Sequence, residues 1–201
     1  MVLTTRDIPF QQLLPMWWDR IEELFPAPQV IIFYHHSSRG LLEQSSASAI
    51  AAAEHLHGLI ATTLSRFADG YLFARQRELM KTYAGDEFKE FRQFLREKLK
   101  EDRPVLGTRL HELLAAITPK QLEKLGLDAA AWIRDVKDVR NKLAHTDAHV
   151  PRRSDSGAEL ERMNTETRAL LTLLILSCLG VDEATLDRAA DVLGNARVTR
   201  A

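Results

Sequence analysis

Apolar side chains recur at the period of an α-helix along most of this chain, and that repeat limits the fold more than any other feature. The clearest run has spacings of three and four residues: Ile50, Ala53, His57, Ile60, Leu64 and Phe67. Side chains at such intervals lie on one side of a helix. We therefore expect a long helix from about Leu41 to Phe67, ending near Gly70.

The same period predicts further helices in the middle of the chain. An amphipathic helix is expected over 86–104, with an inward face made by Phe88, Phe91, Leu95 and Leu99. A proline marks its end, and a shorter helix follows over 105–119. Thr118, followed by a proline, is the expected cap of a short helix that a glycine ends.

Two more long helices are expected toward the C-terminus. Asp128 is the candidate N-cap of the first, whose apolar positions are Trp132, Val136, Val139 and Leu143. The second spans 158–180 and is closed by Gly180, before a short C-terminal helix. The sum is an all-α fold, a bundle of about five main helices, with no strand-rich region.

Residues 1–40 have a different composition, and we expect a short irregular segment there. The stretch 10–25 fits one or two short helices interrupted by a proline. Val30–Tyr34 is an apolar, β-branched run that favours an extended or buried segment, and Ser37–Gly40 favours a turn. We therefore divide the chain into an N-terminal extension over 1–40 and a helical domain over 41–201.

Composition excludes several classes of protein. The net charge of −1 gives no overall basic field for nucleic acid. One cysteine, Cys178, leaves no intrachain disulfide framework and fits a reducing compartment. No apolar run reaches the roughly 20 residues of a membrane helix, and no signal peptide is evident. We expect a cytoplasmic protein that does not enter a membrane.

Metal and cofactor sites are not expected. His55 and His57 are two apart on a helix and point to different faces, so they do not share one metal ion. His35 and His36 are adjacent, and no zinc-binding pattern accompanies them. Cys178 lies in the most apolar helix, where a thiol behaves as a small hydrophobic group.

Arg140 and His145 stand five positions apart in "RNKLAH". In an unbroken helix, five residues turn two side chains about 140° apart, so the pair straddles one edge. One interpretation is that both are ordinary cations at a helix end, where they favour the helix dipole. The other is that they form half of an active site that a second surface completes.

Glu54 lies at the edge of the buried stripe, one turn after Ile50 and three residues before His57. An ionised carboxylate that is buried without a partner is unfavourable. Glu54 must therefore either extend to solvent or meet a cation from another helix.

Two segments resemble a known family. Arg140 and Asn141, followed by Lys-Leu-Ala-His, resemble the Arg-x(4–6)-His signature of the HEPN superfamily, in which Asn, Asp or His typically follows the arginine. The stretch "AAAEHLHGLI" (51–60) resembles the alanine-glutamate-histidine stretch of the ApeA-like branch. The resemblance covers roughly residues 40–180 and implies a HEPN-like helical bundle. Members of that branch usually carry a large N-terminal β-rich region, so we expect residues 1–40 to be its remnant and the chain an excised C-terminal domain.

The resemblance implies a metal-independent endoribonuclease that acts in a defence or toxin system. RNA cleavage of this kind needs a base at the ribose 2′-OH, an acid at the leaving 5′-oxygen, and a cation on the crowded phosphate. His145 suits the base or the acid, because imidazole titrates near neutral pH. Arg140 stays charged and suits phosphate oxygens, and Asn141 would orient the imidazole or the substrate. The products would be a 2′,3′-cyclic phosphate and a 5′-hydroxyl.

One chain supplies a single such histidine, whereas the reaction needs two proton-transfer groups. Family members dimerise, so the resemblance implies a homodimer in which Arg140 and His145 of both copies share one cleft. Glu54 and His57 are the candidate supporting residues, with Glu54 as a carboxylate able to hold Arg140 or His145.

Residues 134–153 carry six lysines and arginines against three aspartates, a local charge of +3. Candidate contacts to the RNA backbone are therefore Lys137, Lys142, Arg152 and Arg153. The expected partners are RNA, a second copy, and a cognate sensor domain or antitoxin. Two other hypotheses stay open: a non-catalytic HEPN-type module that binds RNA, a nucleotide or a partner protein, and a helical dimerisation domain whose motif is fortuitous.

Overall fold

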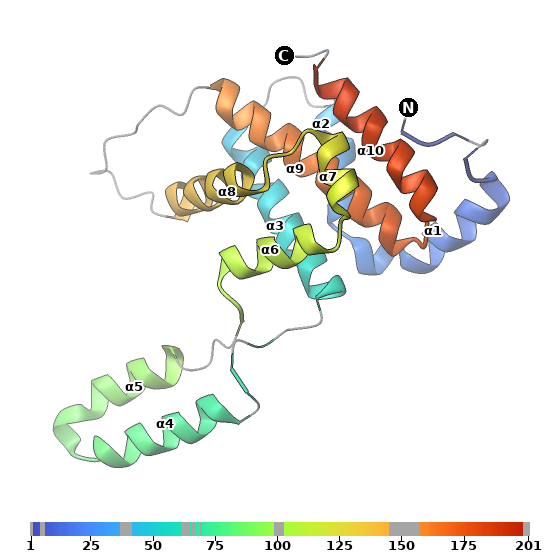
Figure 1. Cartoon of the computed structure of the whole chain (residues 1–201). Coiled ribbons are helices and arrows are strands. Elements are labelled where there is room, and N and C mark those ends of the chain that lie inside the picture. Colours follow the sequence, from blue (N-terminus) through green and yellow to red (C-terminus); the bar gives the residue numbers. More distant parts are fainter. Residues whose placement is uncertain are drawn as a thin grey trace.

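The computed structural model describes residues 2–4, 7–36, 42–61, 65, 67–68, 70–98, 103–144 and 157–198. In this part of the chain there are ten α-helices, one 3-10 turn and no strand, which confirms the all-α fold (Figure 1). The helices are α1 (Phe10–Leu24), α2 (Ala27–His36), α3 (Leu42–Ile60), α4 (Tyr71–Thr82), α5 (Lys89–Lys98), α6 (Leu106–Ala115), α7 (Pro119–Leu125), α8 (Ala129–Ala144), α9 (Gly157–Cys178) and α10 (Glu183–Val198), and the 3-10 turn is η1 (Asp86–Phe88). None of these helices is both long and apolar enough to cross a membrane.

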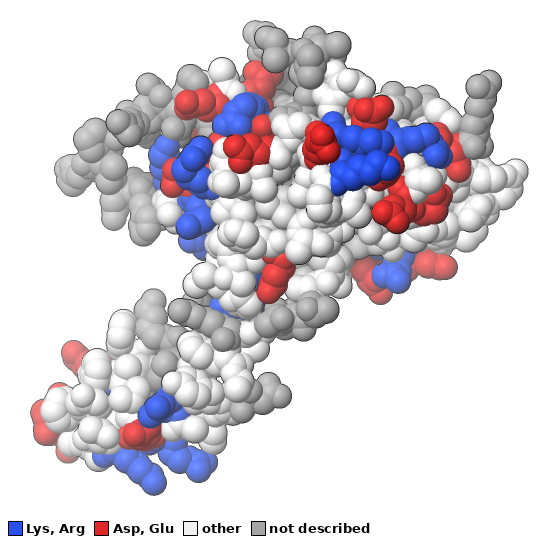
Figure 2. Space-filling model, viewed as in Figure 1, with Lys and Arg blue, Asp and Glu red and all other residues white. Residues whose placement is uncertain are grey.

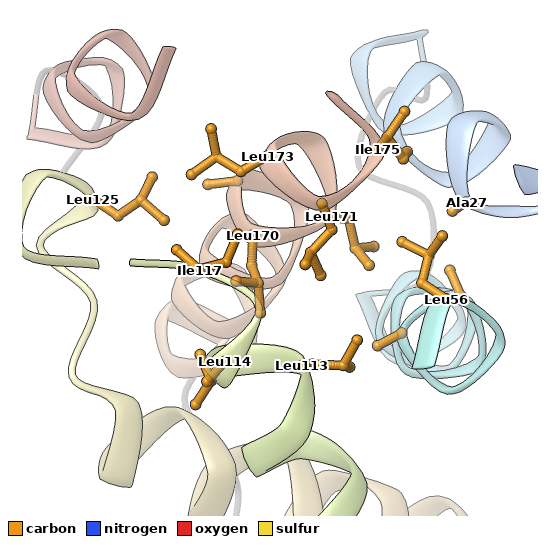
Figure 3. Close-up of a cluster of buried hydrophobic side chains, with 14 of the residues drawn as sticks. Ala27, Leu56, Leu113, Leu114, Ile117, Leu125, Leu170, Leu171, Leu173 and Ile175 are labelled. Atoms are coloured by element: carbon orange, nitrogen blue, oxygen red, sulfur yellow. The ribbon is translucent and has the colours of Figure 1, made fainter. Parts of the chain in front are cut away.

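The helix α9 is the centre of the bundle and is enclosed on almost every side. Leu170, Leu171, Leu173 and Leu174 point in different directions around it, yet each is almost completely buried. Figure 3 shows the side chains of α9 meeting Leu56 of α3, Leu113 of α6 and Leu125 of α7. Full burial of a leucine contributes about 1.5–3 kcal/mol, so α9 holds the other helices together.

Local capping signals place α7 and α8 where the sequence predicts them. Thr118 Oγ1 accepts a hydrogen bond from the Gln121 backbone N–H at 3.2 Å, and the Gln121 side chain accepts one from the Thr118 N–H. Asp128 Oδ1 accepts from the Ala131 N–H at 3.0 Å, which confirms the predicted N-cap. After α9, Gly180 adopts a left-handed conformation (φ +75°) that glycine tolerates at a helix end.

The N-terminal region is helical, so the prediction of an irregular segment is wrong. The helix expected within 10–25 is confirmed as α1, which continues through Pro15, whereas α2 includes the Val30–Tyr34 run, for which we expected an extended or buried segment. The prolines before this run suggested a break, but Pro28 occupies the first turn of α2, where a backbone N–H has no partner within the helix. Leu24 and Ala27 are buried in the common core, and α2 packs on α3 and α9.

The middle of the chain departs most from the predicted helices. The third helix ends at Ile60, and Phe67 instead stacks on the first residue of α4 with 5.3 Å between ring centroids. No sequence pattern used above predicts α4. The helix expected over 86–104 begins with a 3-10 turn and is shorter. Phe91, expected to face inward, is 41% exposed, because α4 and α5 form a hairpin that projects from the bundle (Figure 1). Three further predictions lie outside the described residues: the turn over Ser37–Gly40 and the inward positions of Leu64 and Leu99.

Candidate functional site

The buried face of α8 sets the direction of all its other side chains. Trp132 and Val136 are fully buried, as the predicted stripe requires. The Trp132 indole N–H donates a hydrogen bond to Thr167 Oγ1 of α9 at 3.0 Å, which satisfies the buried donor. These contacts fix the rotation of α8 against α9, and the residues between the buried positions must face outward.

Three predicted site residues lie on one exposed side of α8. Lys137, Arg140 and Asn141 are spaced as i, i+3 and i+4, so they are neighbours on the helix surface, and all three are exposed. Arg140 forms no hydrogen bond or ion pair with any residue that the structure describes. A guanidinium without a protein carboxylate can bind two oxygens of a phosphate.

The side chain of Lys137 reaches across to the first turn of α6. A Cβ atom at Gly107 would lie 3.7 Å from Cδ of Lys137 and 3.9 Å from its Nζ. The N-terminal end of a helix carries a partial positive charge, so Lys137 adds its charge at an end that is already positive. We call Lys137, Arg140 and Asn141 the basic flank of α8.

The side of α8 that faces α9 has mixed charge. Arg162 of α9 binds Asp135 of α8 at 2.5 Å, and Figure 2 shows acidic and basic groups side by side over the bundle. Lys142 faces a cavity of about 320 Å³ on this side. Carboxylates near that lysine oppose phosphate binding, so Lys142 is a weaker candidate contact than Lys137. The charged residues that line the cavity are Arg134, Asp135, Asp138, Lys142, Glu159 and Arg162.

His145, Arg152 and Arg153 lie outside the described residues. The pairing of Arg140 with His145 stays a prediction, as do the RNA contacts of Arg152 and Arg153.

The predicted supporting residues Glu54 and His57 both contact polar side chains of α6. Glu54 Oε2 accepts a hydrogen bond from Nη1 of Arg109 at 2.8 Å, so its partner is a cation from another helix, one of the two alternatives above. One turn further along, His57 Nε2 lies 2.5 Å from Glu112 Oε2. The acid belongs to α3 in the first pair and to α6 in the second, so two polar contacts of opposite sense join the two helices.

A second cavity of about 320 Å³ opens beside the Glu54–Arg109 pair. Arg109 Nε is buried and has no hydrogen-bond partner among the described residues. Sequence reasoning missed Arg109 and Glu112, whose separation of three residues matches that of Glu54 and His57. That signal is readable only once α3 and α6 are known to be neighbours. Neither contact includes Arg140, so support of Arg140 or His145 by Glu54 and His57 stays a prediction.

Within the described residues, no three histidine, cysteine, aspartate or glutamate side chains are arranged to hold a metal ion. Cys178 lies at the end of α9, where burial raises the pKa of its thiol. A thiol with a raised pKa is a poor nucleophile at neutral pH.

Fold and site together define a class of protein: an all-α bundle in which a late helix, packed on a long apolar helix, presents an exposed Arg-Asn pair. The family model for Apea-like HEPN matches residues 48–185, from α3 into α10. The chain therefore belongs to the Apea-like HEPN family. The match includes both stretches on which the resemblance rests, 51–60 and 140–145. No curated protein and no solved structure matches the chain significantly.

Proposed function

We propose that the chain is a metal-independent endoribonuclease whose active site is completed in a homodimer and which acts as a defence or toxin effector. The observation that carries this proposal is the state of Arg140, which is exposed on the basic flank and engages no described carboxylate. A structural arginine at a helix end would be expected to pair with a nearby acid, as Arg162 does with Asp135. Membership of the Apea-like HEPN family supports the same assignment.

The proposed reaction is an attack of the ribose 2′-oxygen on the neighbouring phosphorus. The 2′-O–P bond forms, the P–O5′ bond breaks, and the proton of the 2′-OH is taken by one imidazole while the other protonates the leaving 5′-oxygen. Arg140 stabilises the negative charge that develops on the phosphoryl oxygens. Asn141 orients the imidazole or the substrate, and Lys137 holds an adjacent phosphate. Both histidines in this scheme are His145, one from each copy.

The direct test measures cleavage of a fluorescent single-stranded RNA in the presence of EDTA. His145→Ala and Arg140→Ala should each lower the rate at least about 100-fold, in keeping with the loss of a general acid–base or of an oxyanion stabiliser. Two matched controls should cut at nearly the wild-type rate: Arg134→Ala, an exposed arginine on the same helix, and His111→Ala, an exposed histidine on α6. The 5′ fragment, whose new 3′ end carries the cyclic phosphate, should resist polyadenylation until that phosphate is removed.

Two results would count against the proposal. Cleavage by His145→Ala at the wild-type rate would show that the activity comes from another source. RNA binding without cleavage by the wild-type chain would favour the non-catalytic binding module. In cells, induced wild type should arrest growth and the two site variants should not, unless a cognate sensor domain or antitoxin restrains the wild type.

A further inference from the structure

The α4–α5 hairpin exposes an apolar surface that its own chain does not cover. No residue of α4, and none of residues 89–97 in α5, is buried, and Figure 1 shows both helices standing away from the bundle. Phe73 is 62% exposed and Phe94 51%. Short helices without tertiary packing are marginal in water, and clustered exposed apolar groups are typical of interaction surfaces. The hairpin therefore needs a partner.

A second apolar surface of the same kind lies on α1. Phe10, Leu14 and Trp18 are spaced four residues apart, so they form one row along the helix, and Trp18 is 74% exposed. The adjacent side of α1, about 100° around the helix, packs on the core through Leu13 and Trp17. The exposed row is therefore additional to the one that holds α1 in the bundle.

The two surfaces carry opposite charge. In α1, three acidic residues stand against one arginine, and in α4, three basic residues stand against one glutamate. In α1 the apolar row continues into Glu22, one turn after Trp18. In α4, Arg77 follows Phe73 by one turn. Neither Glu22 nor Arg77 has an ion-pair partner among the described residues.

We propose that the α4–α5 hairpin of one copy packs on α1 of a second copy, and that the exchange is reciprocal. A parallel alignment that sets Phe73 beside Trp18 brings Arg77 of one copy to Glu22 of the other. A reciprocal exchange closes as a twofold dimer and leaves no open end for further growth. The inference deepens the proposed function, because it rests on the homodimer that the composite site requires and names the surfaces that hold it together.

A second copy suits the hairpin better than RNA does. Leu72, Leu79 and Met80 of α4 are only half-buried, and aliphatic groups gain from contact with apolar protein rather than with phosphates. Arg75 of α4 is already paired with Glu78 at 2.6 Å, so less of the positive charge of the hairpin is available to a phosphate. The exposed row of α1 offers both the apolar surface and the acidic residues that complement the hairpin.

Charge reversal with rescue tests the proposal by analytical ultracentrifugation over a range of protein concentrations. Glu22→Arg and Arg77→Glu should each raise the dimer dissociation constant roughly tenfold or more, because each places like charges opposite one another. The double variant should return toward the wild-type value, since it restores an ion pair with reversed polarity. Phe73→Glu should weaken the dimer at least as strongly. Asp191→Arg, a charge reversal on the exposed side of α10, should leave it unchanged.

Three results would overturn the proposal. The first is a dissociation constant that none of the variants changes. The second is a double variant that dimerises more weakly than either single variant. The third is a Phe73→Glu change, made on the His145→Ala background, that lowers RNA affinity and leaves dimerisation intact, which would assign the hairpin to RNA. Failure of the proposed interface is distinguishable from failure of the proposed function. An active ribonuclease whose dimer dissociation constant is unchanged in these variants would refute only the interface. A dimer that follows the predicted pattern but cuts no RNA would refute only the nuclease.

Discussion

The Glu54–Arg109 pair offers the sharpest test of how α3 and α6 are held together. Glu54→Gln keeps the shape of the side chain but removes its charge. The Arg109 side chain is then left 13% exposed without its carboxylate, and its Nε already lacks a hydrogen-bond partner among the described residues. The folded state loses its main compensation for burying that guanidinium.

The expected loss follows from burial. A hydrogen bond to a charged group contributes about 1.5–3 kcal/mol, and removal of one partner from a fully buried pair costs about 3–5 kcal/mol. Because the Glu54 side chain is 28% exposed, water weakens the pair, and we expect a loss of about 2 kcal/mol. For a chain of this length each kcal/mol lowers Tm by about 2–4 °C, so Glu54→Gln should melt about 4–8 °C lower.

Urea melts of two further variants calibrate this value. Arg109→Met removes the cation and leaves a carboxylate that can reach water, so the loss should be about 1 kcal/mol or less. Glu23→Gln is the control, because Glu23 and Arg20 are both exposed and their 3.4 Å ion pair should contribute less than about 0.5 kcal/mol. Equal losses in Glu54→Gln and Glu23→Gln would refute the reasoning from burial.

The same variants test the predicted support of the active site. A purely structural Glu54 leaves RNA cleavage at 25 °C unchanged in both Glu54→Gln and Arg109→Met, provided that both are folded. A Glu54 that holds Arg140 or His145 lowers the cleavage rate when it is replaced, whereas Arg109→Met does not.

Three other expectations follow from local contacts. A hydrogen bond from Lys120, aided by one from Gln121, lowers the pKa of Asp187. The Asp187 carboxylate therefore stabilises the fold above the unfolded pKa of 3.8, and this stabilisation is lost as the pH falls through the lower folded pKa. Urea melts between pH 3 and 7 should show that Asp187→Asn loses less stability in acid than the wild type does. Because burial raises the pKa of the Cys178 thiol, a thiol reagent at pH 8 should label the folded chain much more slowly than the chain in urea. Thr118→Ala removes half of the capping box at α7 and should lower the free energy of unfolding by about 1 kcal/mol, measured by urea denaturation.

Sequence predicted well those helices whose signals are local. The Asp128 cap and the stripe through Trp132 and Val136 each depend on residues within a few turns of one another, so they could be read directly. The second helix was missed because an apolar, β-branched run that follows two prolines is compatible with either a strand or a helix, and only its packing on α3 and α9 decides between them.

Sequence predicted less well those features that depend on distant contacts. The apolar period of α3 continues in the sequence to Phe67, but the helix ends at Ile60. There the chain leaves the bundle, and no neighbouring helix in the described part of the chain would bury a longer apolar stripe. The partners of Glu54 and His57 lie 55 residues further along the chain. Nothing near Glu54 in the sequence distinguishes a carboxylate that faces water from one that binds Arg109.

The exposure of Arg140 follows from the packing of α8 rather than from the motif. With Trp132 and Val136 held in the core and the indole bound to Thr167, rotation of α8 would bury Lys137 and Asn141 or expose the tryptophan. Both changes are costly, since a buried charge needs a partner and an indole gains from burial. The core therefore holds Arg140 at the surface, where it engages no carboxylate that the structure describes and where the proposed RNA substrate and second copy could bind its guanidinium. The proposed active site therefore depends on the contact between two copies more than on the spacing of the motif.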